Sequence, residues 1–279
     1  MSVDSASNGS GVVRHVLGIS GGKDSAALAV YLRDRVPQME YFFCDTGAEL
    51  PETYEYLQRL EAVLGKSIVR LNADRDFDHY LFTFQGALPS PQMRWCTKYL
   101  KIKPLEAWIG DVETNSYIAI RADESREGYI SHKPNIHPIY PFKEDCIDKA
   151  GVLRILERAG VGLPSYYSWR TRSGCYFCFF QRKAEWVGLA DKHPDLFEKA
   201  ADYERKAGYE ATAMQERPYT WTGRESLPEL LDRREEILAK HEAAAKRASA
   251  SGRKLPLLEV LETALDEEDD AQGCLVCHL

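Results

Sequence analysis

A short glycine string near the start of the chain has the residue types of a phosphate-binding loop. The string Ser20-Gly21-Gly22-Lys23-Asp24-Ser25 lies between an apolar run and a stretch with helical spacing. Backbone amides and the start of a helix converge on an anion at such a junction. The glycines let the backbone close around a phosphate, and Ser20, Lys23 and Ser25 can add hydrogen-bond donors. The string is not a Walker loop, which needs Gly, four residues and then Gly-Lys-Ser/Thr.

Cysteines form the second group of residues that could carry chemistry. The chain has seven, an odd number, so we expect ligands or reactive thiols rather than a disulfide framework. Cys175 and Cys178 are spaced so that both sulfurs can reach one metal centre. On spacing alone, this pair fits zinc, a redox dithiol or an iron–sulfur cluster. With the second such pair, Cys274 and Cys277, it could also give zinc four thiolates.

Charged residues follow two of the expected strands. Asp45 stands at a strand end, where parallel sheets place ligand contacts, and it could hold magnesium or a ribose. A turn aspartate is the ordinary alternative. A later strand is followed by Arg121, Glu124, Ser125 and Arg126. The two arginines of that group could clamp phosphates by bidentate contacts.

Two further segments leave their role open. The stretch 94–103 is basic and could stabilise an anionic cluster or substrate, or it could be a solvated helix face. Tyr166, Tyr167 and Trp169 could stack on a base. Packing in the core is the alternative for these aromatic side chains.

Alternating strands and helices position these residues. We expect strands at residues 12–19, 41–44, 67–71 and 117–120. We expect helices at residues 24–35, from Pro51 onward and at 97–109. Short connections between them imply an α/β fold, a parallel sheet with helices on both faces. Past residue 140 the strand signals end, and helices are expected at 147–159, 194–207, 228–248 and 257–265.

These patterns divide the chain into a flexible tail (1–11), a nucleotide-binding α/β domain (12–145) and a helical C-terminal region with an acidic tail (146–279). The composition is 44% hydrophobic and 28% charged, and no apolar run could span a bilayer. The first eleven residues lack the features of a secretory signal, so we expect a cytoplasmic protein. The net charge of −7 disfavours unaided binding to duplex nucleic acid.

The glycine string, in its strand–turn–helix setting, resembles the PP-loop of ATP pyrophosphatases. Four further parts of the chain resemble the phosphoadenosine-phosphosulfate (PAPS) reductase family: residues 44–54, 95–105, 121–126 and 174–178. The resemblance implies an adenine nucleotide alpha hydrolase-like fold that binds ATP and Mg2+. It implies catalytic roles for Lys23, Asp24, Arg121 and Arg126. It also implies nucleotide contacts from the six residues of the glycine string and from Asp45, Glu124 and Ser125.

The same resemblance bears on the cysteines. In adenosine-phosphosulfate (APS) reductases, a Cys pair in the basic segment joins a later CxxC to hold a [4Fe–4S] cluster. This implies Cys96, Cys175 and Cys178 as ligands, although Trp95 stands where the pair would have its other cysteine. Either Cys274 or Cys277 supplies the fourth thiolate, or an open iron binds substrate or sulfide. Zinc remains the alternative metal.

The chain departs from PAPS reductases in two places. Those enzymes lack the Gly-Gly-Lys-Asp string and end in a Glu-Cys-Gly-Leu-His motif, which this chain lacks. The combination is more similar to the ATP pyrophosphatases of bacterial DNA phosphorothioation, the Dnd and Ssp type. It implies an ATP pyrophosphatase that activates an acceptor for iron–sulfur-dependent sulfur transfer.

That function implies a sulfur donor such as a cysteine desulfurase, and partner proteins that present nucleic acid. The alternatives are an APS or PAPS reductase that releases sulfite and a zinc-stabilised nucleotide-binding partner protein. Because we expect the side chains of the glycine loop to be exposed, replacing Lys23 or Asp24 by Ala should lower pyrophosphate release and leave the fold intact.

Overall fold

The computed structural model describes residues 13–125, 131, 133–171, 174–211, 219–223 and 225–250. In these residues, five strands form a sheet: β1 (Arg14–Gly18), β2 (Glu40–Asp45), β3 (Ile68–Asn72), β4 (Thr114–Tyr117) and β5 (Ile136–Ile139). The strand order is β3-β2-β1-β4-β5, and every neighbouring pair is parallel. The expected parallel α/β class is confirmed.

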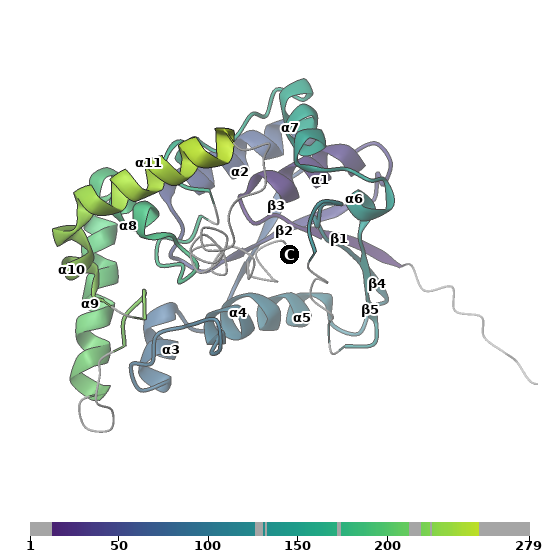
Figure 1. Ribbon diagram of the computed structural model, residues 1–279. Helices are drawn as coiled ribbons and strands as arrows, with labels where there is room; N and C mark the ends of the chain where they lie inside the picture. Colours follow the sequence, from purple (N-terminus) through teal and green to yellow (C-terminus); the bar gives the residue numbers. More distant parts are fainter. Residues whose placement is uncertain are drawn as a thin grey trace, which may run out of the picture.

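Helices cover both faces of this sheet (Figure 1). One face carries α1 (Lys23–Leu32), α2 (Pro51–Leu64) and α7 (Lys149–Arg158). The other carries α3 (Phe77–Thr83), α4 (Trp95–Thr97), a π-helical turn η1 (Lys98–Ile102) and α5 (Lys103–Ile109). Val16 and Leu17 of β1 are both fully buried and pack into the cores on opposite faces. Side chains alternate along a strand, so a strand covered on both faces reads as a continuous apolar run.

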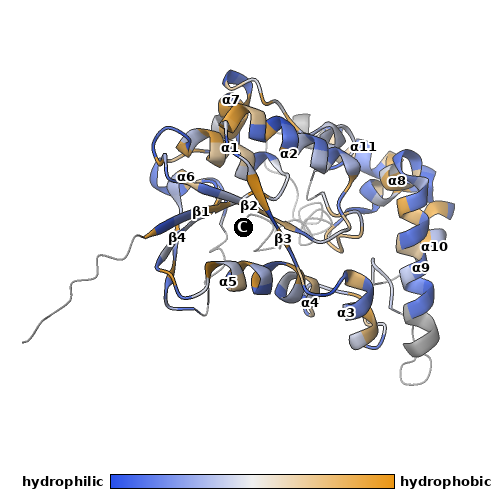
Figure 2. Cartoon of the chain, turned by 180° about the vertical axis from the view of Figure 1, so that it is seen from behind, coloured by the Kyte–Doolittle hydropathy of each residue, from blue (hydrophilic) through white to orange (hydrophobic). Residues whose placement is uncertain are grey.

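The C-terminal half is helical. It contains α6 (Pro141–Glu144), the 3-10 helix η2 (Ser165–Ser168), α8 (Lys183–Lys192), α9 (Pro194–Ala211), α10 (Leu227–Asp232) and α11 (Arg234–Ala250). Helix α8 packs against α9, α10 and α11, and both views place this group at the end of the molecule beside α3. Its buried Trp186, Tyr203 and Trp221 join the core on the α3–α5 face. Figure 2 shows hydrophobic residues on the central strands and hydrophilic residues along much of the outer helices.

The expected elements and the observed ones differ in several places. The strand expected at residues 117–120 is shifted, because β4 ends at Tyr117 and the buried residues after it lead out of the sheet toward Arg121. Strand β5 was missed because it contains Pro138, which suits an edge strand. The helix expected at 228–248 is two helices separated at Arg233. The helix expected at 257–265 lies outside the described residues.

Helices α3 and α8 were also missed by the sequence analysis. Neither contains a long apolar stripe, and α3 has only seven residues. In the described part of the chain, no helix combines the length and hydropathy required to cross a membrane.

Candidate functional site

The glycine loop joins the end of β1 to the start of α1. Gly21 has φ 77°, a left-handed conformation that glycine adopts without strain. Gly22 directly precedes the first turn of α1. The amides of a first helical turn have no acceptor within the helix, and the helix dipole favours negative charge there. The backbone N–H of Ser20 donates to Ser25 Oγ at 3.1 Å, which closes the loop into the compact shape of an anion site.

Lys23, Asp24 and Arg121 form one ion-pair network beside this loop. Lys23 Nζ lies 2.7 Å from Asp24 Oδ2, and Arg121 Nη1 lies 3.2 Å from Asp24 Oδ1. Arg121 also contacts Asp123 at 2.9 Å and Glu124 at 2.6 Å. Burial opposes the charge of Arg121, but the hydrogen bond to Asp123 and the neighbouring carboxylates outweigh it and raise the pKa. The fold therefore brings together four of the predicted site residues.

The expectation that the loop side chains Lys23 and Asp24 are exposed is wrong for Asp24, and the Lys23 side chain is only 13% exposed. Asp24 is 4% exposed and Ser25 is completely buried, because the first turn of α1 packs onto the sheet. Asp24 therefore positions the two cations as well as contributing charge. Replacing it should affect the fold, which the sequence analysis did not anticipate.

Other predicted site residues are placed less centrally. Asp45 Oδ1 accepts hydrogen bonds from the Gly47 N–H at 3.0 Å and the Tyr54 hydroxyl at 2.8 Å. These contacts are those of an aspartate in a turn, and a magnesium or ribose role for Asp45 stays a prediction. Ser125 is exposed, and Arg126 lies outside the described residues.

Two tyrosines of η2, far from the loop in sequence, contact its backbone. The Tyr166 hydroxyl donates to the Gly21 carbonyl at 2.9 Å. The backbone N–H of Lys23 donates to the Tyr167 hydroxyl at 3.3 Å. Tyr166 is completely buried, whereas Tyr167 is partly exposed. Base stacking and core packing were the roles predicted for these residues from the sequence, so their contact with the backbone of the glycine loop was missed.

The three predicted cysteine ligands line one pocket. Cys96 comes from α4, and Cys175 and Cys178 come from the segment that precedes α8. The remaining lining residues are Thr46, Thr97, Leu100, Lys101, Phe177, Phe179 and Phe180. Across the described residues, no three His, Cys, Asp or Glu side chains are arranged to hold a metal ion. Cys274 and Cys277 lie outside those residues. The fold thus gathers the three cysteines without closing them into a finished metal site.

The pocket disfavours negative charge as it stands. Burial raises the pKa of the Cys175 thiol well above its usual range, nearby Glu49 adds to the effect, and Lys101 opposes it. Burial also raises the pKa of Glu49, against the effect of Lys101 and of the 2.9 Å hydrogen bond from Thr46. A metal would reverse this preference, because a coordinating thiol loses its proton.

A buried arginine beside the pocket indicates what the pocket is built to hold. Arg170 is 1% exposed, and its Nη2 donates to the Cys175 carbonyl at 2.6 Å. Among the described residues, its buried Nε and Nη1 have no hydrogen-bond partner. Arginine keeps its proton in proteins, and a buried charge requires a counter-charge. An anionic centre bound by the thiolates of Cys96, Cys175 and Cys178 would supply one, so the residues present fit an iron–sulfur cluster.

The glycine loop and the cysteine pocket are linked through Thr53 of α2. A Cβ atom on Gly21 would lie 2.5 Å from Thr53 Cγ2, and one on Gly174 would lie 2.0 Å from Thr53 Oγ1. Glu49 forms an antiparallel bridge with Cys175, the residue after Gly174. Both loops therefore pack closely against the start of the same helix.

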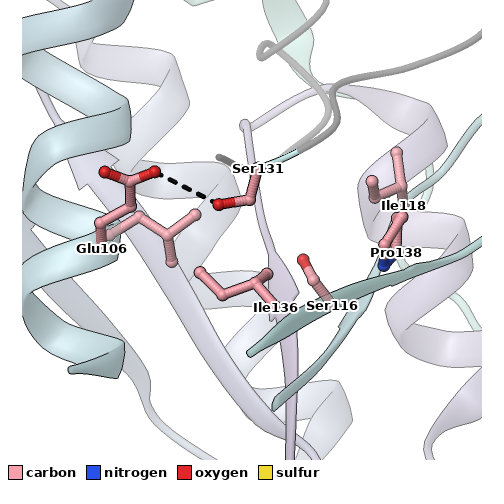
Figure 3. Close-up of a pocket in the computed structure, with 7 residues that line it drawn as sticks. Glu106, Ser116, Ile118, Ser131, Ile136 and Pro138 are labelled. Carbon is pink, nitrogen blue, oxygen red and sulfur yellow. Dashed lines mark hydrogen bonds between the residues drawn. The ribbon is translucent and has the colours of Figure 1, made fainter. Parts of the chain in front are cut away.

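A second small cavity lies between α5 and strands β4 and β5 (Figure 3). Ser131 donates to Glu106 at 3.2 Å on one side of it, and the buried hydroxyl of Ser116 has no partner within the described part of the chain. The rest of the lining is apolar, and none of the predicted site residues reaches it. We assign no chemistry to this cavity.

Comparison with known proteins agrees with this geometry. Residues 14–135 match the family model of the phosphoadenosine phosphosulfate reductase domain. This part of the chain is similar to a PAPS reductase domain. The match contains the glycine loop, Arg121 and Cys96, and it ends before Tyr167 and the CxxC pair. This match does not test the narrower resemblance to the enzymes of DNA phosphorothioation.

Three curated proteins that are similar to this chain are all named as uncharacterised. Two proteins of Methanocaldococcus jannaschii are 25% and 26% identical, over 68% and 66% of this chain and 47% and 40% of their own lengths. The chain thus spans less than half the length of these two relatives. A protein of Escherichia phage 186 is 24% identical over 68% of this chain and 74% of its own length.

Solved structures show more distant similarity. A PAPS reductase from Candida auris, in a phosphate complex, has a TM-score of 0.49 and 12% identity, covering 60% of this chain and 83% of the reductase. The U34-tRNA thiolase NcsA from Methanococcus maripaludis, with its [4Fe-4S] cluster, has a TM-score of 0.42 and 14% identity. The match covers 70% of this chain and 72% of the thiolase. Scores this low say nothing about function.

Proposed function

We propose that this protein cleaves ATP to AMP and pyrophosphate and thereby activates an acceptor for iron–sulfur-dependent sulfur transfer. The observation that carries the proposal is the glycine loop at the start of α1, with the Lys23 and Arg121 cations beside it. Backbone amides, a helix N-terminus and two cations are what a polyphosphate requires. Asp24 holds both cations in position, so little reorganisation is needed when phosphate binds.

The reaction proceeds in two displacements. An oxygen of the acceptor attacks the α-phosphorus of ATP, the bond between the α-phosphorus and the bridging oxygen breaks, and pyrophosphate leaves with that oxygen. A sulfur nucleophile then attacks the activated atom of the acceptor, and AMP leaves with the acceptor's oxygen. Neither step changes an oxidation state, so the sulfur donor must deliver sulfur already reduced. Lys23 and Arg121 stabilise the charge that develops on the departing pyrophosphate.

The cysteine pocket would serve the second displacement. Cys96, Cys175 and Cys178 would hold the cluster, which would provide a site for the sulfur nucleophile when bound. The Arg170 and Lys101 cations would balance its negative charge, and the neighbouring Phe rings would limit access of water. Cys274 or Cys277 remains the candidate for a fourth thiolate. We derive no step through magnesium, because Asp45 Oδ1 accepts hydrogen bonds from Gly47 and Tyr54 and Oδ2 lies 3.8 Å from Arg70 Nη1.

The acceptor that best suits the charge of the chain is nucleic acid presented by partner proteins, as in DNA phosphorothioate modification. A net charge of −7 opposes unaided binding to a phosphate backbone. A cysteine desulfurase would supply the sulfur as a persulfide, and a thiol reductant must then break the S–S bond, with the thiol oxidised to a disulfide as sulfide-level sulfur is released. A cytoplasmic location, where thiols stay reduced, accords with this chemistry.

Sulfonucleotide reduction is the second candidate, because residues 14–135 match the PAPS reductase domain. In that case PAPS or APS would bind at the loop and sulfite would be released upon addition of a thiol donor. The six-residue loop argues for ATP, since its amides and cations suit a terminal pyrophosphate.

One set of assays on protein prepared without oxygen tests the proposal. We expect pyrophosphate release from ATP, stronger competition for binding by ATP than by PAPS, and bound iron and sulfide. Tighter binding of PAPS, with sulfite released in the presence of a thiol, would transfer the assignment to the reductase. A colourless protein that contains zinc and turns over no ATP would leave a non-catalytic, zinc-stabilised nucleotide-binding partner.

A further inference from the structure

The hydroxyl group of Tyr167 lies at the place where the glycine loop would receive a phosphate. It accepts the backbone N–H of Lys23, the first residue of α1, at 3.3 Å. A Cβ atom on Gly22 would lie 3.4 Å from the same hydroxyl. Tyr167 therefore borders the loop at its two central residues, from a part of the chain outside the matched domain.

We propose that Tyr167 is a nucleotide-binding residue whose hydroxyl accepts the Lys23 N–H and donates its own proton to a phosphate oxygen bound at the glycine loop. This inference rests on the proposed function and adds a phosphate contact from the C-terminal half of the chain.

The chemistry of the hydroxyl supports donation. A phenol has one proton and two lone pairs. Within the described residues, the Lys23 amide is the hydrogen-bond partner recorded for this hydroxyl, and it uses a lone pair. The proton therefore remains available for an incoming acceptor. Burial raises the pKa of Tyr167, against the effect of the Lys23 hydrogen bond, so the group keeps its proton at neutral pH.

The surrounding structure holds the tyrosine in place before a ligand arrives. The neighbouring Tyr166 is completely buried and donates to the Gly21 carbonyl at 2.9 Å. The Tyr167 N–H donates to the Pro164 carbonyl, which starts the turn of η2. On the far side, Trp169 packs closely against Gly188 of α8. A donor fixed in this way loses little entropy when it binds phosphate.

If the Tyr167 hydroxyl opposed phosphate binding, its removal would change the affinity in the opposite direction. If the hydroxyl only occupied the Lys23 amide in place of a phosphate, it would compete with the ligand, and its removal would strengthen binding. If it donates to the bound phosphate, its removal weakens binding. The sign of the change decides between the two.

The test compares Tyr167→Phe with Tyr31→Phe, using inorganic pyrophosphate and ATP as probes. Tyr31 also lies on the α1 side of the sheet, but its hydroxyl donates to Asp145, away from the loop. We expect Tyr167→Phe to weaken binding of both probes about tenfold, the cost of one hydrogen bond to a charged group. The KM for ATP should rise more than kcat falls, and the melting temperature should match that of the control.

The outcomes separate this inference from the proposed function. Unchanged or tighter binding of pyrophosphate to Tyr167→Phe, with Tyr31→Phe like the wild type, would overturn the inference. A wild-type protein that binds ATP and pyrophosphate but releases no pyrophosphate would overturn the proposed function, and weaker binding to Tyr167→Phe would still support the contact. A wild-type protein that binds neither probe would overturn both.

Discussion

The glycine loop and the cysteine pocket are built in different ways from the same chain. The loop comes from six consecutive residues, and its Lys23 and Asp24 belong to an ion-pair network with Arg121 and Glu124 whose contacts measure 2.6–3.2 Å. The pocket is assembled from three separate segments, around Thr46, Cys96 and Cys175, and is lined largely by apolar side chains. Among its described lining residues the one lysine is Lys101, which lies near Glu49 and Cys175, two groups whose burial disfavours their charged forms.

The groups of the glycine loop are already in place without a ligand, whereas the charges around the cysteine pocket would be balanced only with a ligand bound. The loop offers amides and cations that are fixed before phosphate arrives. Beside the pocket, Arg170 has two buried donors without a hydrogen-bond partner among the described residues, and an anionic centre held by the cysteines would balance its charge. Variants should therefore affect the two sites separately, unless they act at the contact the sites share.

The largest expected effect is at the loop. Lys23→Ala should lower pyrophosphate release by about a hundredfold, because a cation that stabilises developing charge is lost. Its melting temperature should fall moderately, because the Lys23 side chain is 13% exposed and its loss removes one of the two cations that contact the buried Asp24 carboxylate. Asp24→Ala should lower turnover similarly and also lower the melting temperature, since it removes the buried partner of Lys23 and Arg121. Iron content should stay normal in both variants. Wild-type turnover in both would remove the nucleotide-loop assignment.

The second prediction concerns the pocket and leaves the loop intact. Protein prepared without oxygen should be brown and contain about four irons per chain. Replacing Cys96, Cys175 or Cys178 by Ala should remove the colour, whereas Cys146→Ala, an exposed cysteine outside the pocket, should not. Pyrophosphate release by the loop should persist without the iron, if the acceptor is supplied.

The two cysteines near the C-terminus test which group fills the fourth coordination position of the cluster. Replacing Cys274 and Cys277 together should remove the cluster if either supplies a thiolate. Retained iron with lost sulfur transfer would favour an open iron. One zinc per chain in colourless protein would contradict the cluster and leave the loop assignment standing.

The third prediction tests the shared contact at Thr53. Gly174→Ala should destabilise the fold by roughly 1–3 kcal/mol, as overpacking does, because its methyl group would meet Thr53 Oγ1. Gly21→Ala should also destabilise it, through Thr53 Cγ2 and its positive φ. Thr53→Ser removes Cγ2 and keeps Oγ1, so it should partly rescue Gly21→Ala and fail to rescue Gly174→Ala. Urea unfolding of the single and double variants measures this coupling. Equal rescue of both would contradict the shared contact.

The smallest effect expected on either site is indirect: the free energy of unfolding should depend on pH through a carboxyl group on the cysteine side of the molecule. Glu204 of α9 accepts the backbone N–H groups of Trp221 and Leu227. Trp221 stacks on Phe177 of the cysteine pocket. Burial raises the pKa of Glu204 from 4.5 to about 7, and the two N–H groups oppose the rise. The folded protein therefore binds more protons than the unfolded chain between these pH values.

Stability should consequently fall as pH rises from about 4.5 to 7 and level off above that, by about 3 kcal/mol from this group. Glu204→Gln should flatten this part of the curve of unfolding free energy against pH. A curve of unchanged slope would contradict the shifted pKa. Pyrophosphate binding at the loop should not follow the same pH dependence.

Local patterns predicted much of the fold. The apolar run of β1 and the helical spacing of α1 placed the glycine string correctly, because both depend on neighbouring residues. Features that depend on distant partners were missed or displaced. Strand β4 ends at Tyr117 because its partner β5 ends opposite it at Ile139, and β5 itself contains a proline.

The sequence by itself determined the chemistry that is available: a glycine string with the residue types of a phosphate-binding loop, an arginine after a strand, and cysteines at a spacing that suits a metal. Only the tertiary structure decided which groups meet. It buried Asp24 between two cations, placed the Tyr167 hydroxyl at the Lys23 amide, and enclosed Arg170 beside Cys175. The physical reason is that residue type and spacing describe a chain's own neighbourhood, whereas burial and charge pairing arise from packing between segments more than a hundred residues apart, as with Lys23 and Tyr167.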